Sequence, residues 1–196
     1  PKKPTMTAVP GDGKVTLYWD RVAEESLDPV TKEKDFQGYK IYRATDPNFN
    51  DVRNITDANG LIQGYSTLAQ FDKKDEIKGY FYPSKSLFQD TKGYSYYLGD
   101  DSGLIHSYVD NDVQNGRTYY YALVAYDHGD EEKDIFPSEN SKFISVLPTG
   151  EIITDQNTAY ITPTSSAAGY SLNDTIKTNH QGPGTGSLKI NIVDEQ

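Results

Sequence analysis

Hydrophobic and polar side chains alternate in several short segments of the chain, which is the pattern of half-buried β-strands. In residues 14–20, KVTLYWD, the apolar Val15, Leu17 and Trp19 fall on one face. Residues 36–44, FQGYKIYRA, alternate in the same way. The pattern predicts further strands at 4–9, 64–71, 106–110 and 143–148. No segment shows a sustained helical period, so we expect an all-β protein.

The segment NGRTYYYALVAYD, residues 115–127, differs because neither of its two faces carries a charge between 119 and 126. It follows the turn signal Asn115-Gly116 and ends at an acidic loop. A strand that is uncharged on both faces is covered on both sides. We therefore predict that residues 117–126 form a central strand.

Two regions do not fit a simple series of strands. Residues 45–105 form a long, turn-rich stretch, and loops of that length are usually functional or carry their own structure. Residues 149–196 are rich in Gly, Ser and Thr and contain two more predicted strands, 158–163 and 187–193. Two strands do not make a stable domain alone. They either begin a second β-domain or add to a sheet edge in this chain or a neighbour.

The order of four segments resembles a fibronectin type III domain: GKVTLYWD, GYKIYR, SYVDNDVQNGRTYYYALVAYD and PSENSKFISVLP. Trp19 matches the core tryptophan of that family, and Tyr119, six residues after Val113, matches its corner tyrosine. The resemblance implies an immunoglobulin-like sandwich of seven strands in two sheets, in which the corner hydroxyl bonds to upstream backbone. The expected core residues are Trp19, Tyr39, Ile41, Tyr119, Tyr121 and Leu123.

The resemblance covers residues 4–148, so we expect a domain at 1–148 with an insertion at about 45–105, after the third strand. Residues 149–196 are then a linker with an incomplete second β-domain or joining strands. The chain starts at Pro1, and we expect a processed protein or a piece of a longer one.

Composition narrows the classes of partner. The net charge is −10 and Lys and Arg do not cluster, which argues against binding to nucleic acid or to anionic membrane surfaces. No apolar run approaches the roughly 20 residues of a membrane span, so membrane insertion is not expected. The absence of cysteine excludes disulfides and thiolate chemistry. The hydrophobic content is only 35%, but 16 Tyr and 7 Phe supply large buried surfaces.

The loop DPNFNDVRNITD, residues 46–57, places oxygen ligands at the spacing of a calcium-binding loop. The candidate calcium ligands are Asp46, Asn48, Asn50, Asn54 and Asp57. Asp51, however, replaces the glycine of the template, and Asp57 replaces its bidentate glutamate. The alternative is a turn-rich loop in which Asn and Asp cap their own backbone. Two other acidic sets, 100–112 and 127–134, are weaker candidates for a cation.

The insertion is rich in aromatic side chains that could form a platform for carbohydrate, since exposed rings stack on sugar faces. The candidate residues are Tyr80, Tyr82, Tyr94, Tyr96 and Tyr97. The alternative is that these rings pack the insertion onto the sandwich. No catalytic motif is present and the three histidines lie on separate elements, so an enzyme is not expected.

These observations predict a non-catalytic structural or interaction module that spaces or joins domains or subunits. Its expected partners are adjacent β-domains or neighbouring subunits. The resemblance, which extends to modules of large bacterial surface proteins, implies an extracellular or cell-surface location. Two alternatives are a carbohydrate-binding accessory module and a self-assembling fibre subunit that joins its neighbour through the C-terminal strand.

Overall fold

The structure is a computed structural model that describes residues 1–29, 32–56, 59–82 and 95–166. In these residues the regular secondary structure consists of antiparallel β-strands and one 3₁₀ turn, η1 (Asn50–Val52), so the prediction of an all-β protein is confirmed. No helix of the described residues is both long and apolar enough to span a membrane. The strand predicted at 187–193 lies outside the described residues.

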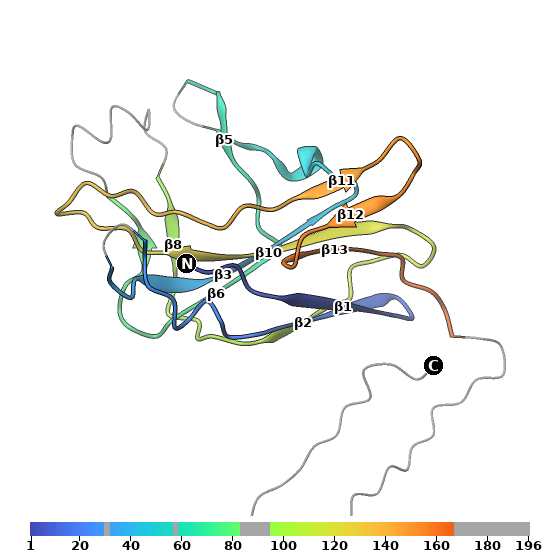
Figure 1. The fold of residues 1–196 in the computed structure, drawn as a ribbon, viewed down its shortest axis with the longest axis horizontal. Helices are drawn as coiled ribbons and strands as arrows, with labels where there is room; N and C mark the ends of the chain where they lie inside the picture. Colours follow the sequence, from blue (N-terminus) through green and yellow to red (C-terminus); the bar gives the residue numbers. More distant parts are fainter. Residues whose placement is uncertain (30–31, 57–58, 83–94, 167–196) are drawn as a thin grey trace, which may run out of the picture.

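Two sheets form the body of the molecule. One has the order β1-β2-β9, with strands Met6–Gly11, Lys14–Trp19 and Ser107–Asp110. The other has the order β13-β10-β3-β6, with strands Thr158–Ile161, Tyr119–Asp127, Phe36–Ala44 and Ala69–Asp72. Figure 1 shows β1 and β2 on one side of the four-stranded sheet. This arrangement is consistent with a β-sandwich.

Three short strand pairs lie outside the two main sheets. They are β4 (Ile55–Thr56) with β5 (Ile62–Gly64), β7 (Gly79–Tyr80) with β8 (Tyr97–Gly99), and β11 (Ile144–Val146) with β12 (Ile152–Thr154). The β11–β12 pair lies on the side of the four-stranded sheet opposite β1 and β2 (Figure 1). The sheet is therefore covered on both faces.

The inner faces of the two sheets share one hydrophobic cluster. Trp19 of β2 packs edge-on against Tyr39 of β3, with 5.9 Å between ring centroids. All six residues expected in the core are buried in this cluster: Trp19, Tyr39, Ile41, Tyr119, Tyr121 and Leu123. They come from β2, β3 and β10, whose alternation points every second side chain inward.

The prediction that 117–126 is a central strand covered on both faces is confirmed. β10 pairs with β3 on one side and with β13 on the other. Its outward-facing Ala122 and Val124 are buried under residues of the β11–β12 pair and of the segment around η1, and its outward-facing Tyr126 is buried under the segments that carry Phe81 and Phe136. The burial of both faces accounts for the absence of charged side chains between residues 119 and 126.

One predicted strand pairs outside the main sheets, and another takes one of its expected alternatives, the edge of a sheet in the same chain. The strand predicted at 143–148 is β11, which pairs with β12 rather than with a main sheet. The strand predicted at 158–163 is β13, which pairs with β10 of the same chain and forms an edge of the four-stranded sheet. The expected boundary at 148–149 falls in the turn between β11 and β12. Alternation predicts where a strand lies but not which strand it pairs with.

Tyr119, expected as a corner tyrosine, bonds to backbone upstream of it. The hydroxyl of Tyr119 accepts a hydrogen bond of 2.9 Å from the backbone N–H of Gln114. Tyr119→Phe should lower the free energy of unfolding by about 1–2 kcal/mol, because a partly buried N–H loses its partner. Urea unfolding measures this change, and Tyr160→Phe on the exposed face of β13 is the control, with an expected change within about 0.5 kcal/mol. Equal effects of the two substitutions would contradict the assignment.

Candidate binding pocket

A pocket of about 430 Å³ opens on the outer face of the four-stranded sheet. Its base is formed by outward-facing side chains of β3 and β6, including Lys40, Tyr42 and Gln70. Its walls come from the long segment between β3 and β9 and from the loop around residue 137. Concave sites of 300–1,000 Å³ with aromatic and a few polar side chains are typical of small-ligand sites.

The β7–β8 pair brings an exposed and a half-buried tyrosine together in the lining of the pocket. Tyr80 and Tyr97 are cross-strand partners, and their ring centroids are 5.2 Å apart. Asp72 of β6 anchors this pair, because its buried carboxylate accepts hydrogen bonds from the backbone N–H groups of Asp101 (2.7 Å) and Ser102 (2.9 Å). The short strand β8 is therefore fixed beside β6.

A glycine is required where β8 meets this anchor. Gly99 has φ +133°, and a Cβ atom there would lie 2.3 Å from the Cγ of Asp72. Only a residue without a side chain allows the backbone to approach the carboxylate this closely.

The inner wall of the pocket is part of a second hydrophobic cluster. Tyr96 is buried against Tyr126 of β10, with 5.8 Å between ring centroids, and packs edge-on against Phe136. Phe81 is buried in the same cluster. These rings attach the segment between β3 and β9 to the outer face of the sheet, as the packing alternative proposed.

Lys40 of β3 is the unusual residue of the pocket. It is 6% exposed, and its Nζ lies 3.5 Å from the ring centroid of Tyr96 and 4.8 Å from that of Tyr126. Its ammonium donates no hydrogen bond to any residue that the structure describes. Burial lowers the pKa of Lys40 to about 8, although Glu139 acts in the opposite direction. A buried lysine with a shifted pKa at a pocket is a mark of a functional site.

Glu139 lines the pocket as well and supplies a negative charge, but its carboxylate has other partners. It accepts hydrogen bonds from the hydroxyls of Tyr42 (2.9 Å) and Tyr96 (3.1 Å), and Nζ of Lys142 lies 3.7 Å away. Lys142 also lies over the ring of Tyr65, 3.6 Å from its centroid, and burial lowers its pKa. Glu139 is thus shared among three groups.

The tyrosines predicted for carbohydrate do not all lie together. Tyr80, Tyr96 and Tyr97 line the pocket, with Tyr80 52% exposed and Tyr96 buried. Tyr82 is 71% exposed and lies outside the lining, and Tyr94 lies outside the described residues. A hydrogen bond to Asp100 raises the pKa of Tyr97 to about 12, so its hydroxyl stays protonated. Tyr96 therefore serves in packing, whereas Tyr80 and Tyr97 remain accessible.

The predicted calcium loop uses its oxygen atoms in internal hydrogen bonds. Oδ2 of Asp46 accepts from the backbone N–H (3.0 Å) and Nδ2 (2.7 Å) of Asn50, and also bonds to Asn48, which lowers its pKa. Oδ1 of Asn54 accepts from the hydroxyl of Ser66. Asp57 lies outside the described residues. These contacts are those of the self-capped alternative, and calcium binding at 46–57 stays a prediction.

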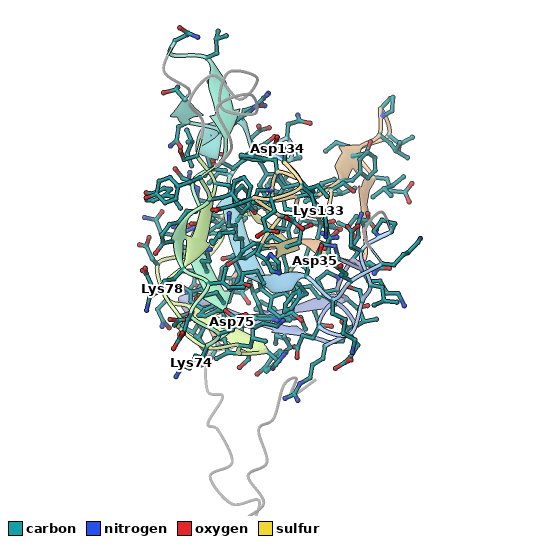
Figure 2. All side chains as sticks on the ribbon, turned by 90° about the vertical axis from the view of Figure 1, so that its left-hand side faces the viewer. Asp35, Lys74, Asp75, Lys78, Lys133 and Asp134 are labelled. Carbon is teal, nitrogen blue, oxygen red and sulfur yellow. The ribbon has the colours of Figure 1, made fainter. Side chains whose placement is uncertain are left out.

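Of the second acidic set, Asp110 is buried and Asp101 pairs with Lys78 at 3.0 Å. A cluster that the sequence did not indicate joins Asp28, Asp35 and Asp127, whose oxygen atoms lie within 4.8 Å of one another. Burial and the neighbouring carboxylates raise the pKa of Asp35. Figure 2 shows Asp35 at an end of the molecule where charges of both signs are interspersed.

Lys40 is the pocket residue that sequence reasoning missed. Its signal was a single positive charge in the middle of a strand whose other residues from 36 to 42 are uncharged. Its cross-strand neighbours, Val124 and Gln70, are uncharged too. Alternation placed Lys40 on the face opposite Tyr39 and Ile41 but could not show that this face is covered.

No protein-family model, no curated protein and no solved structure matches the chain. The fold is that of an all-β protein, with a pocket on the outer face of the four-stranded sheet. Its function is inferred from the chemistry of that site.

Proposed function

We propose that the protein is a non-catalytic module of an extracellular or cell-surface protein, built on a fibronectin type III-like sandwich, and that it binds carbohydrate in the pocket. Three features support the fold: the strand orders β1-β2-β9 and β13-β10-β3-β6, the core position of Trp19, and the hydrogen bond of the Tyr119 corner.

The observation that carries the proposed binding is the pair of accessible rings in the pocket lining. The aromatic rings of Tyr80 and Tyr97 line a cavity of about 430 Å³, a volume that accommodates one or two sugar rings. Polar groups of Thr67, Gln70 and Ser95 line the same cavity. Aromatic faces stack on the C–H faces of sugars while amides and hydroxyls bond their hydroxyls.

Binding to a panel of immobilised neutral and acidic oligosaccharides tests this proposal. Tyr80→Ala and Tyr97→Ala should each weaken retention about fivefold to tenfold, because each removes one stacking surface. Their melting temperatures should stay close to that of the parent protein, since neither residue is buried in a hydrophobic cluster.

Tyr82→Ala is the matched control, because Tyr82 is exposed but does not line the pocket. It should leave retention unchanged. Absence of retention of every oligosaccharide by the parent protein would contradict the proposed function. So would an equal loss with Tyr82→Ala, which would move the binding surface away from the pocket.

A further inference from the structure

The geometry points to a carboxylate-bearing sugar as the ligand, with the carboxylate of its acidic residue bound by the ammonium group of Lys40. This inference rests on the carbohydrate-binding function proposed above and names the class of sugar. Uronic acids and sialic acids share the required chemistry.

Lys40 lacks a hydrogen-bonded counter-charge among the described residues. A lysine that is almost fully buried is normally paired, because removing an ammonium from water carries a large desolvation cost. Among the described residues, the side chain of Lys40 has no ion pair or hydrogen bond, and its ammonium lies over the faces of Tyr96 and Tyr126. These contacts compensate the lost hydration only in part, because a cation–π contact is weaker than the hydration of an ammonium group. Lys40 lines the pocket, so a ligand can reach it.

Glu139 does not neutralise the pocket. Its carboxylate bonds to two tyrosine hydroxyls and lies 3.7 Å from Lys142. Arg53 adds a further positive charge over the ring of Tyr65, which also lines the pocket. Among the described residues, the charged groups that line the pocket or contact its lining are Lys40, Lys142 and Arg53 against Glu139 and Asp100, in a chain of net charge −10. A positive site of this kind selects anions that the rest of the surface repels.

Cationic ligands and neutral sugars do not fit the charge of this site. The aromatic faces of Tyr96 and Tyr126 already hold the ammonium of Lys40, so a cationic ligand would meet a like charge there. A neutral sugar would cover Lys40 and leave it without a counter-charge, which costs free energy. A carboxylate pairs with the ammonium, while the accessible rings of Tyr80 and Tyr97 hold the sugar face.

Esterification of the ligand gives the sharpest test, because it removes the charge and keeps the sugar ring. Isothermal titration would use trigalacturonate, a glucuronate-containing disaccharide and sialyllactose, each as the free acid and as the methyl ester. The parent protein should bind at least one free acid about tenfold or more tightly than its ester. The affinity for the acid should fall above pH 8 as Lys40 loses its proton.

Lys40→Met keeps the aliphatic stem and removes the ammonium, so it should bind acid and ester equally. Lys40→Gln is a second variant in case the methionine perturbs packing. Lys142→Met is the matched control, because Lys142 lies beside Glu139 but outside the pocket lining. It should retain the preference for the acid, which would separate the role of Lys40 from that of general positive charge.

The outcomes separate this inference from the proposed function. Equal affinity of the parent protein for acid and ester, or binding of neutral oligosaccharides alone, would overturn the role of Lys40 and leave carbohydrate binding intact. An unchanged acid preference in Lys40→Met would do the same. Absence of binding to every acidic, esterified and neutral sugar would overturn both.

Discussion

Arg43→Met is expected to lower the free energy of unfolding by about 3–5 kcal/mol, because it leaves a buried carboxylate without its ionic partner. Nη1 of Arg43, on β3, donates to both carboxylate oxygens of Asp110, on β9, at 3.0 Å. The hydroxyl of Tyr121, on β10, donates to the same carboxylate at 2.7 Å. Asp110 is buried and belongs to the other sheet, so this network joins the two sheets.

Urea unfolding, followed by the fluorescence of Trp19, measures the change. The double variant Arg43→Met, Asp110→Asn should recover part of the loss, because it also removes the buried charge. Asp112→Asn is the control: Nη2 of Arg43 also bonds to Asp112, but the side chain of Asp112 is 92% exposed, so the change should stay under about 1 kcal/mol. If Arg43→Met cost no more than Asp112→Asn, the network would not hold the sheets together.

Much of the fold could be predicted, because the alternation of apolar and polar residues shows which side chains lie on the same face of a sheet. One face of β2 had to carry the apolar Val15, Leu17 and Trp19. Both faces of the uncharged segment 119–126 had to be covered by other parts of the protein. Pairing was harder to predict, because a short strand such as β13 has the same pattern whether it joins this sheet or another. Asp110 shows the same limit, since spacing along the chain does not reveal that Arg43 faces it across the two sheets.

The pocket could be predicted only in part, for a related reason. The density of tyrosines in 80–97 indicated an aromatic surface, but the ring of Tyr96 is buried and that of Tyr80 is exposed. That division depends on which ring meets Tyr126 of β10, a contact between distant segments. Lys40 could not be predicted as a site residue for the same reason, since its burial comes from segments more than 50 residues away in sequence.

The free energy of unfolding is expected to rise between pH 8 and pH 9.5, because Lys40 is less basic in the folded chain than in the unfolded one. The unfolded lysine keeps its proton up to about pH 10.4, whereas the pKa of Lys40 in the folded protein is about 8. Between these values the unfolded chain binds more protons, so raising the pH favours the folded state, by at most about 1.4 kcal/mol per pH unit. Lys142, whose pKa burial also lowers, acts in the same direction.

The buried tyrosines set the upper end of the pH range in which this rise in stability is expected. Burial raises the pKa of Tyr39, Tyr121 and Tyr126, so above about pH 10 their ionisation in the unfolded chain favours unfolding. Unfolding curves measured from pH 7 to 9.5 therefore report the contribution of the lysines to stability without that of the tyrosines. Lys40→Met should reduce the slope and raise stability at pH 7 by about 1–3 kcal/mol, since a desolvated charge is replaced by an apolar side chain of similar length.

Exposed lysines provide the control for this pH dependence. Lys78→Met should leave the slope between pH 8 and 9.5 unchanged, because the ion pair with Asp101 raises the pKa of Lys78 rather than lowering it. A parent slope that persists in Lys40→Met would assign the effect to Lys142 or to other groups. A flat parent profile would mean that the Lys40 ammonium is well solvated in the folded protein. The pocket would then contain no buried charge for an acidic sugar to neutralise.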